Sequence, residues 1–260
     1  MSYALILSLF TQIAMAEEYT PGYTQKASDF MAQRTAASHA AFLMPHLRDS
    51  ARLLDCGCGP GSISCDFARI LASGYVTGID REESQIELAR SRASEQQLTN
   101  MTFKVGSIYE LPFPDSSFDV VFAHAIFEHI SSPDKALAEI LRVLEPGGIA
   151  AIRSPDWGGF IVGPEVPGLQ TAIKSYADLQ TANGGDIYVG RKLPRLLRDA
   201  GFDTLRFSAT YDCYQSPSLI AEVLALRLAD TEADALRVWS QDRDAFFAQA
   251  WCEILGTKNA

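Results

Sequence analysis

The sequence predicts an α/β fold with a doubly wound, mostly parallel sheet and helical additions at both ends. Two observations carry this prediction. Short apolar segments alternate with helical segments of about a dozen residues, a pattern typical of βαβ units. The chain has 260 residues, of which 47% are hydrophobic, and this is enough for a substantial core.

The predicted elements follow one another regularly. Residues 26–47 carry apolar positions at helical spacing, with Pro45 near the end, so we expect a leading helix. Strands are expected at residues 51–56, 75–80, 101–105, 117–124 and 147–153. Helices are expected between them at residues 61–72, 83–97 and 133–144. Ser132-Pro133-Asp134 supplies a helix start, because proline suits the first turn.

The pattern loosens after residue 154 in a stretch rich in proline and glycine. Helices at about 169–182 and 190–200 and a strand at 202–209 follow. We expect helices at about 217–229 and 231–254 in place of a clear seventh strand. The chain therefore divides into an apolar segment (1–16), a helical cap (17–50), an α/β domain (51–210) and a helical extension (211–260).

The first sixteen residues, MSYALILSLFTQIAMA, imitate a signal peptide. They lack a basic n-region, their apolar core is short, and they do not reach transmembrane length. A signal peptide, a start codon assigned too early with the true beginning near Met15, and an apolar helix stay open as readings. The five cysteines do not suggest a disulfide framework and favour a reducing compartment, so we expect a cytoplasmic protein without a membrane span.

Charge and cysteine spacing exclude other classes. A net charge of -10 and a pI near 4.9 argue against binding to nucleic acid, which usually requires a basic face. Cys56 and Cys58 lack a second pair at ligand spacing, so no metal site is expected.

The loop after the first predicted strand indicates the ligand. Its glycines, Gly57, Gly59 and Gly61, are spaced G-x-G-x-G, which differs from the G-x-G-x-x-G of dinucleotide-binding loops. Asp55 at the mouth of the loop would repel a pyrophosphate and attract an ammonium group. Asp80 ends the second strand, where a carboxylate can bind both hydroxyls of a ribose. S-adenosylmethionine, a sulfonium with an adenosine and no phosphate, fits these features better than a dinucleotide.

Several motifs together resemble the class I S-adenosylmethionine-dependent methyltransferases, in their quinone-biosynthesis and small-molecule (methyltransferase type 11-like) branch. They cover about residues 19–210 and read LLDCGCGPG, GID, LPFPDSSFDVVFAHAIFEHI, LRVLEPGGIAAI and GRKLPRLLRDAGF. The resemblance implies that Asp55, Gly57, Cys58 and Gly59 hold the methionine moiety of the cofactor. It further implies ribose binding by Asp80, adenine contacts from Arg81, Ser107 and Ile108, and a carboxylate contact from Arg34. Ser107 stands where many relatives carry an acid.

Catalysis is assigned to histidines at and after the end of the fourth strand, and acceptor binding to segments outside the sheet. Histidines at 124 and 129 are the candidate general bases, and His124 also faces the cofactor. A small-molecule methyl acceptor is expected against Tyr19, Tyr23, Trp157 and Phe160, with Tyr211 and Tyr214 as further aromatic candidates. S-adenosylhomocysteine would be the product, and the protein would be a monomer or a homodimer. A non-catalytic S-adenosylmethionine-binding protein and a nicotinamide-dependent oxidoreductase are the alternatives.

Overall fold

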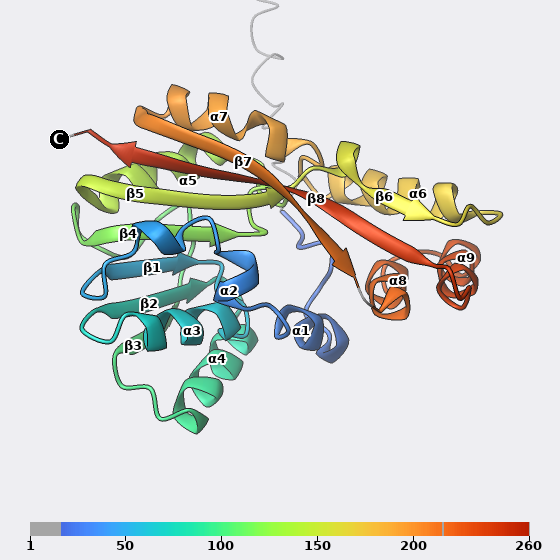
Figure 1. Ribbon diagram of the computed structural model, residues 1–260, viewed down its shortest axis with the longest axis horizontal. Helices are drawn as coiled ribbons and strands as arrows, with labels where there is room; N and C mark the ends of the chain where they lie inside the picture. The colour runs from blue at the N-terminus through green and yellow to red at the C-terminus, as the bar shows by residue number, and fades with distance from the viewer. Residues whose placement is uncertain (1–16, 215, 260) are drawn as a thin grey trace, which may run out of the picture.

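One sheet runs through the part of the molecule that the structure describes (Figure 1). The computed structural model describes residues 17–214 and 216–259, so the apolar segment 1–16 lies outside the described residues. The strand order is β3–β2–β1–β4–β5–β8–β6, and β7 also pairs with β8. The bounds are β1 (Arg52–Cys56), β2 (Tyr75–Asp80), β3 (Met101–Val105), β4 (Phe118–His124), β5 (Leu144–Pro155), β6 (Ile161–Gly163), β7 (Phe202–Tyr214) and β8 (Phe246–Lys258).

The first five strands are parallel, which confirms the predicted fold class. β8 runs antiparallel to β5, β6 and β7. The carboxyl ends of the parallel strands therefore lie at one edge of the sheet. In Figure 1 this edge faces α1 (Gln25–Met31).

Helices cover both faces of the sheet. On one face, Leu54 and Val121 pack with α5 (Pro133–Val143) and α7 (Val189–Asp199). On the other face, Leu53 and Phe122 pack with α2 (Ala36–His39), η1 (Met44–His46) and α3 (Ser62–Ile70). Phe103 of β3 packs against α3 and α4 (Glu83–Glu95). Neighbouring residues of β1 thus point into different cores, as strand geometry requires.

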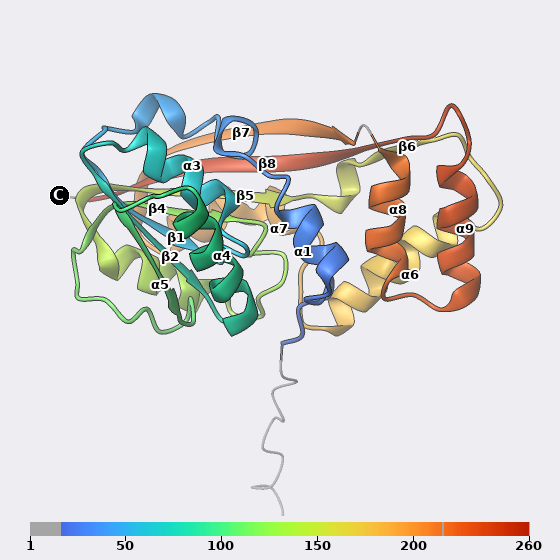
Figure 2. The same ribbon diagram turned by 90° about the horizontal axis from the view of Figure 1, so that it is seen from below.

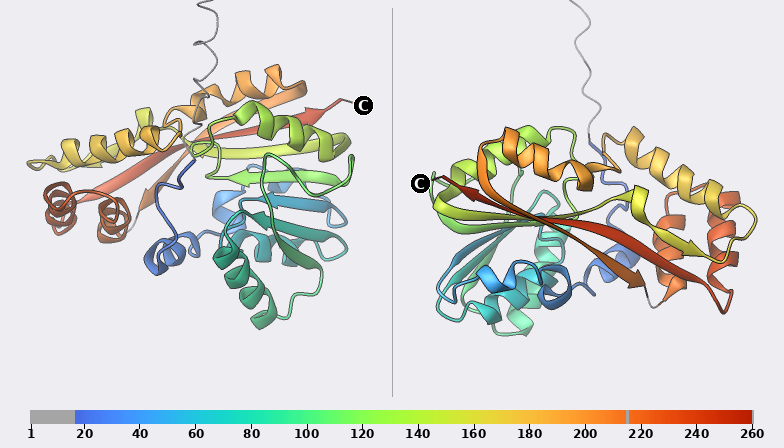
Figure 3. Two further views of the ribbon diagram at one scale, coloured as in Figure 1. Left: turned by 180° about the vertical axis from the view of Figure 1, so that it is seen from behind. Right: turned by 45° about the horizontal axis from the view of Figure 1, so that its top comes forward.

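A second core lies beside the sheet (Figure 2). We call it the helical lobe; it consists of α6 (Leu169–Ala182), α8 (Pro217–Ala225) and α9 (Asp230–Ser240), packed on β6 and the start of β8. Trp239 is 1% exposed at its centre, and its indole N–H donates to the Gly163 carbonyl at 3.0 Å. Both views in Figure 3 show the β7–β8 pair extending from the main sheet toward this lobe.

Most of the predicted elements are confirmed to within a few residues, and two predictions are wrong. The leading helix expected over 26–47 is broken into α1, α2 and η1. α1 ends at Met31, and a second helix begins where the Thr35 side chain accepts from the Ser38 N–H at 3.2 Å. Arg34 therefore lies in a loop between helices.

The helix expected over 231–254 is also wrong. α9 ends at Ser240, and residues 246–258 form β8 in place of helix. β8 is buried on both faces, because Ile254 packs in the core with α5 and α7 and Leu255 packs in the core with α2 and α3. Its sequence therefore lacks the polar and apolar alternation of a half-exposed strand. The extension after residue 211 is consequently part sheet and part helix.

None of the helices within residues 17–214 and 216–259 is both long enough and apolar enough to cross a membrane.

Candidate functional site

Two adjoining pockets open at the carboxyl ends of the parallel strands. The first pocket lies over β1, β2 and β4 and includes Gly57, Gly59, Asp80, Arg81, Gln85, Ser107, Ile108 and His124. The second pocket lies between the sheet and the helical lobe and includes Phe30, Glu128, Trp157, Tyr176, Tyr214 and Trp251. Both are lined by Tyr19, Met31, Arg34, Ala125 and His129, so they meet at these residues.

The backbone N–H groups of the glycine loop are already bonded within the protein. Gly57 and Cys58 donate to the Ile79 carbonyl at 2.8 and 2.9 Å, and Gly59 donates to Asp80 Oδ2 at 2.9 Å. A phosphate-binding loop instead directs such donors at its ligand. The geometry therefore disfavours the dinucleotide alternative.

All three glycines of this loop have a positive φ that favours glycine, and two of them line the first pocket. Gly57 has φ +69°, and a Cβ there would lie 2.0 Å from Ile126 Cδ1. Gly59 has φ +52°, and a Cβ there would meet only Met31 Sδ, at 3.7 Å. A side chain at Gly59 would project toward the space that a ligand needs.

Asp55 is buried at the base of the loop. Its Oδ2 accepts from Ser64 Oγ at 2.5 Å, and it lines a small recess together with Arg34, Gly57 and His124. Burial, aided by the nearby Asp80 charge, raises the pKa of Asp55 to about 7. A bound cation would lower this pKa again, because it favours the charged carboxylate form.

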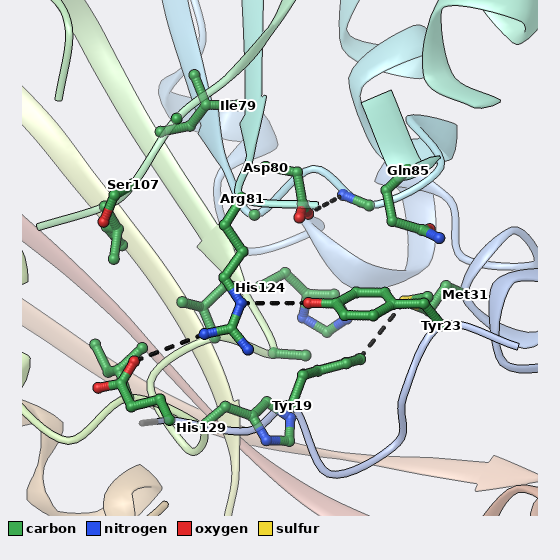
Figure 4. Close-up of a pocket in the computed structure, with 18 of the residues that line it drawn as sticks. Tyr19, Tyr23, Met31, Ile79, Asp80, Arg81, Gln85, Ser107, His124 and His129 are labelled. Atoms are coloured by element: carbon green, nitrogen blue, oxygen red, sulfur yellow. Dashed lines mark hydrogen bonds and ion pairs between the residues drawn. The ribbon is translucent and has the colours of Figure 1, made fainter. Parts of the chain in front are cut away.

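Asp80 and Gln85 offer polar atoms to the first pocket (Figure 4). Asp80 Oδ1 accepts from the Glu82 N–H at 3.0 Å, and burial raises its pKa. The Gln85 amide donates to Ser28 Oγ at 3.0 Å, and its buried Oε1 has no partner. Buried polar atoms normally find partners, so this orphaned oxygen indicates a missing ligand.

The segment before α1 closes over the first pocket. Arg81 Nε donates to the Tyr23 hydroxyl at 3.3 Å, and the rings of Tyr19 and Tyr23 stack at 5.1 Å (Figure 4). Glu17 accepts from the N–H and the hydroxyl of Ser131, each at 2.6 Å, and from the Tyr109 hydroxyl. These contacts place Tyr23 beside the first pocket and Tyr19 where the pockets meet.

Three further residues were expected at the cofactor: Ser107, Ile108 and Cys58. The first is exposed, the second packs on the core and the third is buried in it. Ser107 is exposed, and its hydroxyl accepts from the Tyr109 N–H at 3.2 Å, while Ile108 packs on the core. The Cys58 side chain packs in the core near Phe103, and burial raises the pKa of its thiol. Cys58 therefore stays a neutral thiol at the edge of the small recess.

Arg34 lies at the centre of the site. It lines both pockets and the recess beside Asp55, and its guanidinium carbon lies 5.7 Å from the centroid of the Phe30 ring. Within the described ranges it forms no salt bridge. A cation placed so is suited to a carboxylate ligand.

His124 is buried and His129 is half-buried, and neither is a strong base. Burial and the charge of Arg34 hold the pKa of His124 well below its usual range, and neither ring nitrogen has a partner. The same causes lower the pKa of His129 to about 3. His129 lies in a turn after β4 rather than in a helix, because its N–H donates to the Ile126 carbonyl at 2.9 Å.

The backbone between β4 and this turn is strained. Ala125 follows the strand directly and has φ +57°, the left-handed region that non-glycine residues rarely adopt. Its N–H donates to the Arg153 carbonyl at 2.9 Å, which fixes the conformation. Strain of this kind is common at functional sites.

Aromatic rings line the second pocket beside aliphatic residues such as Leu224 and polar residues such as Gln180 and Gln249. Trp157 stacks on Tyr176 with ring centroids 5.5 Å apart, and Phe30 stacks on Tyr214 at 5.8 Å. Phe160 packs against Phe247 within the helical lobe. Tyr211 is half exposed and lines a groove with Asp212 and Tyr214, and this groove meets the second pocket at Phe30, Arg34, Tyr214 and Trp251.

Sequence reasoning did not assign a role to Glu128 at this site. Glu128 is 2% exposed and lines the second pocket. A lone acid among the apolar residues of AIFEHI was the available signal, because a charged residue is almost never buried without a reason. No three or more His, Cys, Asp or Glu side chains gather to hold a metal ion in residues 17–214 and 216–259.

Comparisons with known proteins agree with this geometry. A family model described as a methyltransferase domain matches residues 47–215. An uncharacterised methyltransferase of Schizosaccharomyces pombe is 28% identical over 204 residues, covering 75% of this chain and 73% of that protein. A probable methyltransferase, ltbC, of Aspergillus luteorubrus is 37% identical over 144 residues, covering 52% of this chain and 50% of that protein.

A solved structure shares the fold. The YcgJ protein of Bacillus subtilis aligns with a TM-score of 0.67 at 21% identity, covering 86% of this chain and 99% of that one.

Proposed function

The chain belongs to the class I S-adenosylmethionine-dependent methyltransferases, and from this premise we propose that it methylates a small, apolar or aromatic acceptor. The acceptor would occupy the second pocket. Its aromatic lining, continuous with the first pocket, is the observation that carries the proposal.

The first pocket fits the cofactor. Gln85 Oε1 and the ring nitrogens of His124 are buried without partners, and a polar ligand would satisfy them. Asp80 would accept from the ribose hydroxyls, while Asp55 and Arg34 would face the ammonium and the carboxylate of the methionine moiety. When bound, S-adenosylmethionine supplies an activated methyl group. The protein's task is to hold the acceptor in line with that methyl group and free of water.

The second pocket suits an acceptor with an apolar ring. Trp157, Tyr176, Tyr214 and Phe30 supply flat apolar surface, and offset or edge-on contacts with such rings stabilise an aromatic ligand. Tyr19 and His129 lie where this pocket meets the first one, so an acceptor atom there would lie beside the cofactor.

Transfer from labelled cofactor tests the proposal. The protein is incubated with methyl-labelled S-adenosylmethionine and a metabolite extract, and labelled products are identified by mass. We expect label in a small apolar or aromatic product. Tight cofactor binding with no labelled product from any extract would favour a non-catalytic binding protein. Binding of NADH in place of S-adenosylmethionine would contradict the proposal at its root.

A further inference from the structure

Glu128 is a buried acid that no role described above explains. Its backbone carbonyl accepts from the Gln180 amide at 3.0 Å and from the Asp186 N–H at 3.1 Å. Its Oε2 accepts from Ser154 Oγ at 3.0 Å. Side chain and backbone are therefore fixed, and a fixed acid in a ligand pocket is suited to act on that ligand.

One carboxylate oxygen of Glu128 is left for a ligand. Oε1 lies 3.6 Å from His129 Nε2, which is too long for a hydrogen bond. Glu128 lines the second pocket, and the neighbouring His129 lines both pockets. An acceptor group bonded to Oε1 would thus lie close to where the pockets meet.

The groups that face Glu128 come from several elements. Arg34 precedes α2, Arg153 lies on β5, and Tyr19 and Tyr176 lie on the first segment and on α6. Burial raises the pKa of Glu128 to about 7, although a hydrogen bond from its own backbone N–H, the Ser154 hydroxyl and the two arginines act in the opposite direction. Glu128 is therefore a far stronger base than His129, whose pKa is lowered to about 3. A base with a pKa near the working pH is the most effective.

We infer that Glu128 Oε1 binds the acceptor's hydroxyl and takes its proton, so that the acceptor class is a phenol or a similarly weak oxygen acid on an apolar ring. This inference rests on the proposed function. The acceptor oxygen forms a bond to the methyl carbon, and the methyl–sulfur bond breaks with its electron pair left on sulfur. The acceptor proton passes to Glu128 and then to solvent, so charge and atoms balance.

Binding of two matched probes tests the hydrogen bond without any turnover. 2-Naphthol carries the hydroxyl, whereas 2-methoxynaphthalene has the same rings and no proton to donate. In the presence of S-adenosylhomocysteine, we expect the wild type to bind 2-naphthol about tenfold or more tightly than the ether, as a bond to a charged acceptor implies. Glu128→Gln keeps the side-chain shape and should reduce this preference to about twofold or less.

Turnover with two phenols separates proton transfer from a structural role. With 2-naphthol at neutral pH, Glu128→Gln should lower kcat about 10²–10³-fold, the usual contribution of a general base. With 4-nitrophenol, which is largely ionised just above neutral pH, the loss should be about tenfold or less because little proton transfer remains. Glu87→Gln is the matched control, since Glu87 is exposed on α4, outside both pockets.

Each outcome decides one of the two proposals. If methyl-labelled S-adenosylmethionine labels no product from any extract, the proposed function fails, and the inference falls with it. If an extract product is labelled but the wild type neither binds 2-naphthol nor methylates either phenol, only the inference fails. If the wild type binds and methylates but Glu128→Gln keeps the preference for 2-naphthol, only the inference fails. An equal loss of kcat with both phenols, accompanied by a lower melting temperature, would assign Glu128 a structural role and likewise overturn it.

Discussion

The two pockets are built in different ways. The first is lined mainly by short segments that directly follow parallel strands, and its loop donors are bonded to neighbouring strand ends. The segment around α1 adds Tyr19, Tyr23 and Arg34 to it. The second is assembled from α1, β5, α6, the end of β7, α8 and β8, which lie far apart in the sequence. The difference teaches that the floor of the first pocket is formed by segments that the strand ends position directly, whereas the second pocket depends on how the helical lobe packs.

Asp80→Ala should cause the largest loss of affinity that is confined to the ligand of one pocket. Loss of charge-assisted hydrogen bonds should weaken S-adenosylmethionine binding by about 1–3 kcal/mol, or about 5–150-fold, as measured by calorimetry. Binding of 2-naphthol should change by about twofold or less, because Asp80 lines only the first pocket. An unchanged cofactor affinity would remove Asp80 from the site.

The affinity for S-adenosylmethionine, measured over a series of pH values, tests whether Asp55 binds the cofactor's ammonium group. Its pKa is raised to about 7, so the carboxylate that attracts the cofactor's ammonium is lost as pH falls through this value. The affinity for S-adenosylmethionine should therefore fall up to about tenfold per pH unit below 7 and level off above it. Asp55→Asn should bind more weakly at pH 8 and show a flatter profile. The same steep slope in this variant would assign the pH dependence to another group.

Trp157→Ala tests the second pocket alone, because Trp157 does not line the first pocket. Removing the ring that stacks on Tyr176 should weaken 2-naphthol binding by about 1 kcal/mol, or about fivefold, with cofactor affinity unchanged. Phe207→Ala is a matched control because Phe207 is exposed on β7, outside both pockets. If both variants bind 2-naphthol equally well, the aromatic pocket is not the acceptor site.

A substitution at Tyr19 should affect both ligands, because Tyr19 lines both pockets. Tyr19→Ala should weaken the cofactor and 2-naphthol alike, by a few fold each. Tyr19→Phe should leave both affinities within about twofold, since the hydroxyl makes only a weak contact with Met31 Sδ at 3.6 Å. A loss confined to one ligand would show that the pockets are not joined at this residue.

The residues that meet at the first pocket could be predicted from the sequence because their signals are local. The strand ending at Asp80 has the bounds expected for it, and the spacing of Gly57, Gly59 and Gly61 already disfavoured a phosphate loop. Arg34 was expected on a continuous helix and lies in a loop, because Thr35 starts a new helix. That break is what allows Arg34 to reach the recess beside Asp55.

The acceptor half could not be predicted because it depends on β8. The segment FFAQAWCEILGTK contains alanine, glutamine, glutamate and leucine, which favour helix locally. Pairing with β5 and β7 overrides that preference, and only this pairing carries Phe247 and Trp251 to the second pocket. Glu128 was missed for a related reason, since its partner Ser154 lies at the end of another strand.

The position of β8 between β5 and β7 also affects how the chain folds during its translation. Within the described sheet, β5 and β6 have β8 as a neighbour, and β7 pairs with β8 alone, yet β8 follows all of them in the sequence. While the ribosome is still translating residues 156–245, β5 therefore presents an open edge to other chains, a recognised route to aggregation. We expect nascent chains stalled before Phe246 to need a chaperone, and the acceptor pocket to form only after translation has passed β8.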